Sequence, residues 1–204
     1  MKRIIIWLCV VLCMGCVSHS KVPIDSPPMT RPEVITVTYN LIVAHEDLHV
    51  AQDAIWQIHN AESLFFPLQI HFQLGQIYTD LDSRDCYQNR YGVLSIYIVK
   101  RRAMMFQPDG MSVLPWQNQP PTIWITGCQD PSTYAHECGH TFGLLHTFNE
   151  NDYVDDTPRD FMNADSRNIM NYSNWPWYFQ EFTPGQLERA KLYLKLFLLK
   201  HKYE

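Results

Sequence analysis

The amino-acid sequence predicts a mixed α/β (α+β) domain, in which a mixed β-sheet carries packed helices. The chain has 204 residues, of which 46% are apolar and 18% are charged, enough to build one domain with a sizeable core. The hydrophobic pattern reads as a strand, a helix, several strands and then further helices, an order typical of such a sheet.

The first half of the folded region alternates between strand and helix patterns. Residues 34–43 (VITVTYNLIV) form a short β-branched run, which favours a buried strand. Apolar residues then recur at helical spacing, which predicts a helix of about four to five turns that ends before Pro67. These positions are Leu48, Ala51, Ile55, Ile58 and Ala61. Two further strands are expected at residues 68–78 and 93–99.

The second half holds shorter strands and more helix. Strands are expected at residues 110–116 and 122–126. The last helix begins at Thr183, which is a good N-cap, because Pro184 suits the first helical position and Gln186 reaches back in a capping box. Its apolar face consists of Leu187, Ala190, Leu194 and Phe197.

The N-terminus has the layout of a bacterial export signal. Basic residues at positions 2 and 3 precede an apolar run from Ile4 to Met14, and Gly15 and Cys16 follow. Gly15 before Cys16 resembles a lipoprotein processing site, although Cys13 stands where such sites usually carry leucine. We therefore expect a lipoprotein-type signal at residues 1–16, while an ordinary cleaved signal and an uncleaved anchor remain alternatives. All three place the folded domain outside the cytosol.

A proline-rich polar segment separates the signal from the folded region. We interpret residues 17–33 as a tether and residues 34–204 as the folded domain. Three cysteines fall in the folded part, and an oxidising compartment permits one bridge among them. A Cys86–Cys128 bridge is a weak preference, and the alternative is that Cys86, Cys128 and Cys138 are all free and buried.

The segment HECGHTFGLLH, which begins at residue 136, carries metal-binding chemistry. His136 and His140 are four residues apart, so on a helix they point the same way and can hold one ion. Gly143 lets the chain leave the helix, which brings His146 round as a third ligand. Glu137 lies beside His136 and can act as a general base.

The same chain contains a second HExxH that lacks the remaining features. His45, Glu46 and His49 spell this pattern, but Gln52 and Ile55 stand where the glycine and the third histidine are needed. We interpret it as a solvated helix start.

The full pattern HExxHxxGxxH resembles the metzincin clan of zinc endopeptidases, whose second hallmark is a methionine turn. More narrowly, several stretches resemble the pappalysin-like branch of that clan, so that the resemblance covers residues 34–195. These stretches are LSIYIV (94–99), GMSVLPW (110–116), HTF (146–148), DDTP (155–158), NIMNYS (168–173) and FTPGQ (182–186).

The resemblance implies a domain that is divided by a substrate cleft. An upper subdomain, residues 34–143, would hold a twisted sheet and two long helices, and an irregular lower subdomain, residues 144–204, would end in a helix. Met170 would underlie the zinc without bonding to it, and Tyr172 would hydrogen-bond the reacting oxyanion. Packing in the lower subdomain is the alternative role for Tyr172. Residues 110–116 would form the rim on which an extended peptide pairs.

Two other groups in the lower half have open interpretations. Five acidic residues could hold a structural calcium ion or form a solvated loop, namely Glu150, Asp152, Asp155, Asp156 and Asp160. Four aromatic residues could line the main specificity pocket or fill a small core, namely Trp175, Trp177, Tyr178 and Phe179. Within the metal-binding segment, Cys138 points away from the ligand face and is interpreted as core.

The sequence therefore predicts a zinc-dependent endopeptidase that acts on proteins or peptides outside the cytosol, with one zinc-bound water activated by Glu137. The alternatives are a zinc hydrolase of a non-peptide amide and a non-catalytic surface binding module. The formal net charge of −5 argues against a nucleic-acid partner. We expect a monomer attached to a bacterial outer membrane or surface through Cys16, or otherwise periplasmic or secreted.

Overall fold

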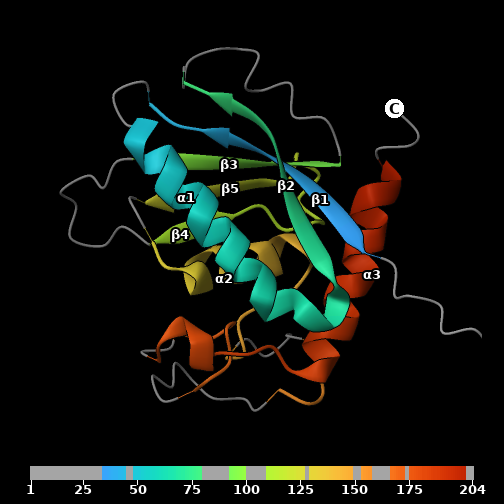
Figure 1. Ribbon diagram of the computed structural model, residues 1–204. Coiled ribbons are helices and arrows are strands. Elements are labelled where there is room, and N and C mark those ends of the chain that lie inside the picture. Colours follow the sequence, from blue (N-terminus) through green and yellow to red (C-terminus); the bar gives the residue numbers. More distant parts are fainter. Residues whose placement is uncertain are drawn as a thin grey trace, which may run out of the picture. The chain divides into compact units, whose positions relative to one another are not determined.

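A mainly parallel β-sheet with helices packed on it forms the centre of the molecule, as the computed structural model shows (Figure 1). The structure describes most of the unit formed by residues 32–204. The described residues are 34–44, 48–79, 92–99, 109–126, 129–148, 153–157, 166–172 and 175–200. The signal and tether expected at residues 1–33 therefore lie outside the described part.

The sheet has five strands in the order β2-β1-β3-β5-β4. β1 (Ile35–Ile42), β2 (Ile70–Tyr78), β3 (Val93–Val99) and β5 (Thr122–Thr126) run parallel to one another. β4 (Gly110–Ser112) pairs antiparallel with β5 and lies at the edge of the sheet. The expected mixed sheet is thus confirmed, with its one antiparallel pair at the β4 edge.

Strand residues alternate between two packed faces, as the period of two in a strand requires. Leu41, Ile96 and Ile123 stand in register across three strands, and each is 0% exposed in the main core. Tyr97 points to the other face, where its ring stacks on Trp124 at 6.0 Å. Burial on both faces explains why β3 is apolar at every position except Ser95.

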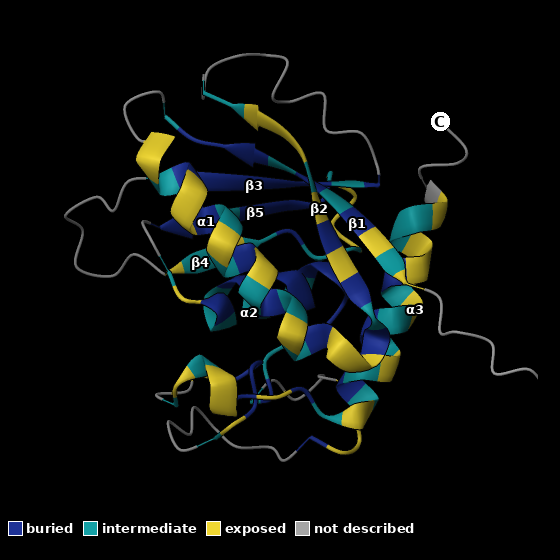
Figure 2. Ribbon diagram, viewed as in Figure 1, coloured by how far each residue is buried: buried dark blue, intermediate teal, exposed yellow. Residues whose placement is uncertain are grey.

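Helices supply the second layer of the fold. α1 (Leu48–Ala61) and α2 (Pro131–Thr141) contact each other and contribute to the main core, while α3 (Pro184–Lys200) ends the described chain. Figure 2 shows that α1 turns a buried side inward and an exposed side to solvent. The buried residues of α1 are Ala51, Ala54, Ile58 and Ala61.

The first helix ends before Pro67, as expected, because α1 ends at Ala61. A 3₁₀ helix that was not predicted, η2 (Glu62–Leu68), follows it and contains Pro67. Proline disfavours an α-helix interior, because it lacks an N–H and its ring clashes with the carbonyl four residues earlier. The strand expected at residues 110–116 is shorter than predicted, because β4 ends at Ser112. Beyond it, one more hydrogen bond to β5 runs from the Val113 N–H to the Thr122 carbonyl. Pro115 has no N–H to extend the ladder.

Among the described residues, no helix is long and apolar enough to cross a membrane.

Candidate metal centre

Local sequence determines where α2 begins and ends, and therefore where its histidines lie. Asp130 caps the helix, because its carboxylate accepts hydrogen bonds from the N–H groups of Ser132 and Thr133. Pro131 occupies the first turn, which suits a residue without an N–H. The helix ends at Thr141, and Gly143 follows with φ of +83°, a left-handed conformation that glycine adopts without strain.

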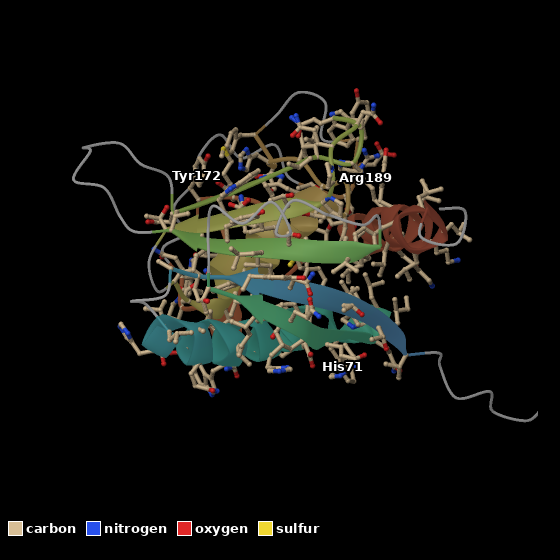
Figure 3. The ribbon with its side chains drawn as sticks, turned by 90° about the horizontal axis from the view of Figure 1, so that it is seen from above. His71, Tyr172 and Arg189 are labelled. Atoms are coloured by element: carbon tan, nitrogen blue, oxygen red, sulfur yellow. The ribbon has the colours of Figure 1, made fainter. Side chains whose placement is uncertain are left out.

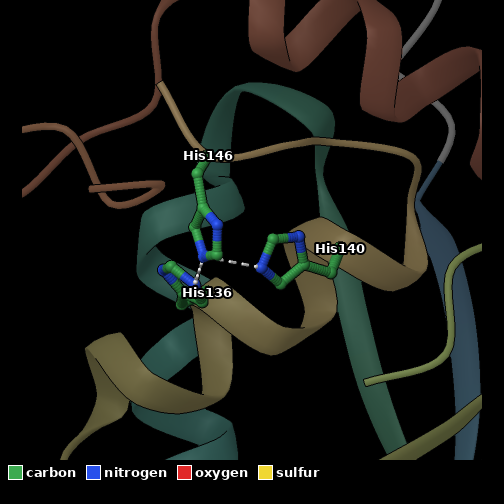
Figure 4. A group of neighbouring side chains, drawn as sticks. All are labelled: His136, His140 and His146. Carbon is green, nitrogen blue, oxygen red and sulfur yellow. Dashed lines mark hydrogen bonds between the residues drawn. The ribbon is translucent and has the colours of Figure 1, made fainter. Parts of the chain in front are cut away.

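The turn at Gly143 brings three histidines together, as the sequence predicts. His136 and His140 project from α2, and His146 follows the turn (Figure 4). The Nε2 atom of His146 lies 3.1 Å from Nε2 of His136 and 3.2 Å from Nε2 of His140. We call this group the triad. Among the described residues, it is the group of three metal-ligating side chains whose ligand atoms all lie within 4.8 Å of one another.

Backbone carbonyls determine which nitrogen carries the proton in two of these rings. His136 Nδ1 lies 2.6 Å from the Ile169 carbonyl, and His140 Nδ1 lies 2.8 Å from the Leu144 carbonyl. A carbonyl only accepts, so each Nδ1 must donate, and a neutral ring then has a bare Nε2. The Nε2 atoms of His136 and His140, which both lie close to His146 Nε2, therefore carry lone pairs without protons.

The electrostatics of the triad favour neutral rings. Burial, followed by the charge of neighbouring His140, lowers the pKa of His136 to about 3 and that of His146 to about 4. Burial also lowers the pKa of His140. Neutral imidazole is the form that binds metal.

The spacing of these nitrogens fits a zinc ion. In a tetrahedral site, zinc–nitrogen bonds of ~2.0–2.1 Å place the ligand nitrogens roughly 3.3 Å apart. The two measured separations, 3.1 and 3.2 Å, are close to this value. Three protein ligands leave a fourth position, which is the arrangement of a catalytic zinc site.

Glu137 lies beside His136 on α2 and is 5% exposed. Ser112 Oγ on β4 donates a hydrogen bond of 2.6 Å to its Oε2 atom. Burial raises the pKa of Glu137 to about 7, while the Ser112 hydrogen bond acts in the opposite direction. The sequence predicted Glu137 as a general base, but it did not indicate a role for Ser112.

Met170 supports α2 from below. It is fully buried, and its Sδ atom lies 2.6 Å from the position that a Cβ atom on Gly139 would occupy. Gly139 is therefore small because the methionine packs against the helix backbone between the two helical histidines. The Met170 carbonyl also accepts a hydrogen bond of 3.2 Å from the Thr147 N–H, next to His146.

Tyr172 stands beside the triad on its solvent side. Its ring centroid is 5.1 Å from that of His146 and 5.4 Å from that of Phe148, and it stacks over His136 at 6.3 Å. Tyr172 is 55% exposed. Figure 3 shows Tyr172 on the side of the chain opposite His71.

A buried amide pair holds the segment that carries Met170. Asn168 Nδ2 donates to Gln186 Oε1 at 2.9 Å, and Gln186 Nε2 donates back to Asn168 Oδ1 at 3.1 Å. The same Asn168 Oδ1 accepts the Met170 N–H, and Gln186 Oε1 accepts the Thr183 N–H. The expected capping box is thus confirmed, and Gln186 has a second contact that local sequence reasoning missed.

The structure describes two of the five acidic residues of the calcium hypothesis, Asp155 and Asp156. Asp156 caps α3, because its carboxylate accepts hydrogen bonds from Thr183 Oγ1 at 2.7 Å and from the Gly185 N–H at 2.8 Å. Asp155 is exposed. The other three acidic residues of the calcium hypothesis, at positions 150, 152 and 160, lie outside the described part.

The exposure of Cys138 and of two aromatic residues bears on the interpretations given for them. Cys138 is free and 2% exposed in the main core, where burial raises the pKa of its thiol, so it is core as expected. Cys86 and Cys128, the pair favoured for a bridge, lie outside the described residues. Tyr178 and Phe179 are 61% and 50% exposed on the 3₁₀ helix η4 (Trp177–Phe179), so they do not fill a core.

The second HExxH of the sequence is only partly described. His49 lies exposed in the first turn of α1, in agreement with a solvated helix start, and His45 and Glu46 lie outside the described residues.

Residues 73–182, more than half of the chain, match the family model described as Metallo-peptidase family M12. The chain belongs to this metallopeptidase family. The matched segment includes β4, α2 with the whole triad, and Met170. The mixed sheet and its helices agree with the expected metzincin-like fold of such a metallopeptidase.

One solved structure similar to this metallopeptidase is metalloproteinase-II from Bacteroides fragilis. The two share 14% sequence identity with a TM-score of 0.46, and the match covers 81% of this chain. This chain spans 55% of the length of that protein. No curated protein matches the sequence.

Proposed function

We propose that this metallopeptidase is a zinc-dependent endopeptidase in which the triad holds the metal and Glu137 acts as the general base. The observation that carries the proposal is the convergence of the triad. Two of its rings are held by backbone carbonyls as the tautomer with a bare Nε2, and two nitrogen separations fit zinc. Metal-ligating histidines are generally oriented by such a hydrogen bond, which the ring nitrogen that does not bind the metal donates.

The roles of the individual residues follow from their positions. When bound, zinc would supply a Lewis acid that polarises the scissile carbonyl and lowers the pKa of water. Glu137, next to a ligand and buried at the edge strand, would accept the proton of the attacking water and pass it to the leaving amine. Tyr172, beside the triad and exposed, has room to place its hydroxyl near the reacting oxyanion.

The narrower assignment to the pappalysin-like branch is part of the proposal. It rests on the quoted stretches, two of which each form hydrogen bonds with a third, FTPGQ. The Asp156 carboxylate of DDTP bonds to Thr183 of FTPGQ, and Gln186 of FTPGQ pairs with Asn168 of NIMNYS. Such contacts support a shared role for these stretches in building the lower half, residues 144–204, beneath the upper half, residues 34–143.

The decisive experiment compares the purified full-length chain with Glu137→Gln. Both are loaded with zinc, their zinc content is measured by mass spectrometry, and each is incubated with a diverse peptide library. We expect the wild type to cut internal peptide bonds. Glu137→Gln should bind one zinc and lose about 10²–10⁴-fold in rate, the usual contribution of a general base. The matched control, Glu188→Gln on the exposed side of α3, should cut like the wild type.

If the wild type binds zinc and cuts no peptide, the endopeptidase proposal fails. Hydrolysis of a non-peptide amide, or binding without catalysis, would then replace it.

We also propose that the chain is exported and lipid-anchored at Cys16, with a protein or peptide as substrate and no nucleic-acid partner. The basic residues, the apolar run and the Gly15–Cys16 pair support this. In a bacterial host, metabolic labelling with a fatty acid should mark the wild-type chain and the Cys13→Ser control, and Cys16→Ser should lose the label. Labelling that persists in Cys16→Ser would contradict the anchor.

A further inference from the structure

The edge strand β4 holds the carboxylate of Glu137 from two sides. Ser112 Oγ donates a 2.6 Å hydrogen bond to Oε2. At Gly110, a Cβ atom would lie 2.5 Å from Oε1 and 2.8 Å from the carboxylate carbon, so the missing side chain provides the space in which Oε1 lies. Gly110 therefore leaves the room, and Ser112 supplies the bond.

The hydrogen bond from Ser112 orients the carboxylate group of Glu137, which the backbone of α2 does not orient by itself. The α2 backbone determines the position of the Glu137 Cα atom, but the last torsion of a glutamate side chain has a broad, roughly two-fold preference. A hydroxyl–carboxylate hydrogen bond of about 2.5–2.7 Å is of the strong, charge-assisted kind. Ser112 is itself held in place, because β4 pairs with β5 on either side of it.

We propose that Ser112 is a positioning residue for the peptidase reaction, which holds the Glu137 carboxylate in the orientation that receives the proton. This rests on the proposed role of Glu137 as the base. A base must lie within hydrogen-bond reach of the proton that it takes, and a loosely oriented carboxylate meets that condition only part of the time. Ser112 acts through Glu137 and makes no bond to the substrate in this role.

A purely structural role for Ser112 makes different predictions. If the hydroxyl only satisfied a buried carboxylate, its loss would lower stability or zinc content and leave the turnover of each zinc-loaded molecule unchanged. A positioning role lowers kcat, leaves KM and zinc content unchanged, and is restored by another residue with a hydroxyl at the same place.

The test uses the full-length chain with Ser112→Ala and Ser112→Thr, assayed on the best-cleaved peptide of the library. We expect Ser112→Ala to bind one zinc, to keep KM within about twofold and to lose about tenfold in kcat, as for other residues that orient a catalytic group. Ser112→Thr should recover most of that loss. Ser63→Ala is the matched control, because Ser63 is exposed and donates only to the Asn60 carbonyl.

The outcomes separate this proposal from the proposed function. If Glu137→Gln is inactive while zinc-loaded Ser112→Ala turns over within twofold of the wild type, the positioning role is overturned and the role of Glu137 stands. If Glu137→Gln keeps its activity, the proposed role of Glu137 as the base is wrong, and the positioning role of Ser112, which rests on it, is wrong as well. Should Ser112→Ala not fold, Ser112→Cys replaces it, since a thiol is a weaker donor of similar shape. A full kcat in Ser112→Cys overturns the proposal, and a lowered kcat with bound zinc supports it.

Discussion

Two histidine clusters of this molecule contain similar residue types and differ in what surrounds them. The triad is built on α2 and the turn after it, and its inward nitrogens approach within 3.1–3.2 Å. A second group, which we call the surface cluster, consists of His59, Glu62 and His71 at the junction of α1, η2 and β2. Figure 3 shows His71 far from Tyr172, the neighbour of the triad.

The surface cluster is centred on one carboxylate oxygen. Glu62 Oε1 lies 3.2 Å from the Nδ1 atoms of both His59 and His71, and it also accepts the Phe72 N–H at 2.8 Å. The His59 and His71 side chains are 45% and 51% exposed. Among the described residues, only the triad has three ligand atoms that all lie within 4.8 Å, so the surface cluster does not meet that limit.

The difference teaches what makes histidines into a metal centre. In the triad, backbone carbonyls accept the outer N–H groups of His136 and His140, and burial keeps the rings neutral, so the inner nitrogens of these two rings carry lone pairs that can bind a metal. In the surface cluster, a carboxylate is the partner and water reaches the rings. Residue type and proximity are similar, but the backbone around the rings decides the chemistry.

The largest effect should come from breaking the triad. His140→Ala removes one of the three ligands, so the chain should lose its zinc and about a thousandfold or more in kcat/KM, the several kcal/mol that a catalytic metal contributes. Zinc content by mass spectrometry and peptide cleavage measure the two effects. His59→Ala in the surface cluster is the matched control and should retain one zinc. Full zinc content and activity in His140→Ala would contradict the assignment of the triad.

A smaller effect should come from disturbing the packing beneath the triad. Gly139→Ala places a Cβ atom 2.6 Å from Met170 Sδ in a fully buried site. The methionine or the helix must move, and overpacking of this kind costs about 1–3 kcal/mol of unfolding free energy. Urea denaturation measures it. Ser63→Ala, next to the surface cluster, should change stability by about 0.5 kcal/mol or less. Equal stabilities of Gly139→Ala and the wild type would show that Met170 is not held against the helix.

The pH dependence of stability should also report on the triad in the metal-free protein. The pKa of His136 is lowered to about 3 and that of His146 to about 4, so the unfolded chain takes up protons first as the pH falls below about 6.5. The raised pKa of Glu137, about 7, acts in the opposite sense, because the folded chain holds that proton. The shifts of the histidines outnumber that of the glutamate, so the net result is a loss of stability as the pH falls from about 6.5 to about 4.

Urea denaturation in the presence of a chelator, at several pH values in this window, tests that expectation. His146→Asn removes one of the side chains whose pKa is lowered, so the stability of this variant should depend less steeply on pH than that of the wild type. A wild-type stability that rises toward acid would reverse the sign and contradict the burial of neutral rings.

Sequence patterns predicted the parts of this centre that depend on short separations along the chain. The spacing of four between His136 and His140 determines their common direction on a helix, and a glycine at position 143 allows the turn to His146. The capping box at Thr183 and Gln186 is equally local. The main strands were found for a related reason, since β-branched runs mark buried strands.

The missed contacts join residues that are distant in sequence. Ser112 and Glu137 are 25 positions apart, and Asn168 and Gln186 are 18 apart. Each pair meets only because the sheet edge, the helices and the segment that carries Met170 are packed together. A serine or an asparagine has many partners available in sequence, so its residue type alone does not single out one of them. The α-helix ends before Pro67 as predicted, but the 3₁₀ helix η2 that follows was not predicted, because a proline signal does not distinguish the end of a helix from a change to a 3₁₀ helix.

The smallest effect should come from the surface cluster, and it sharpens the comparison most. His71→Ala removes an exposed pair with Glu62, and such pairs contribute about 0–1 kcal/mol because solvent screens them and the side chains lose entropy. Unfolding free energy should fall by less than about 1 kcal/mol at pH 7. Zinc content and kcat/KM should stay within about twofold of the wild type, because the triad and its carbonyl partners lie elsewhere. If His71→Ala instead loses one equivalent of zinc that the triad variant His140→Ala retains, water-exposed rings around a carboxylate would bind metal as well as buried ones do. The distinction between the two clusters would then rest on catalysis alone.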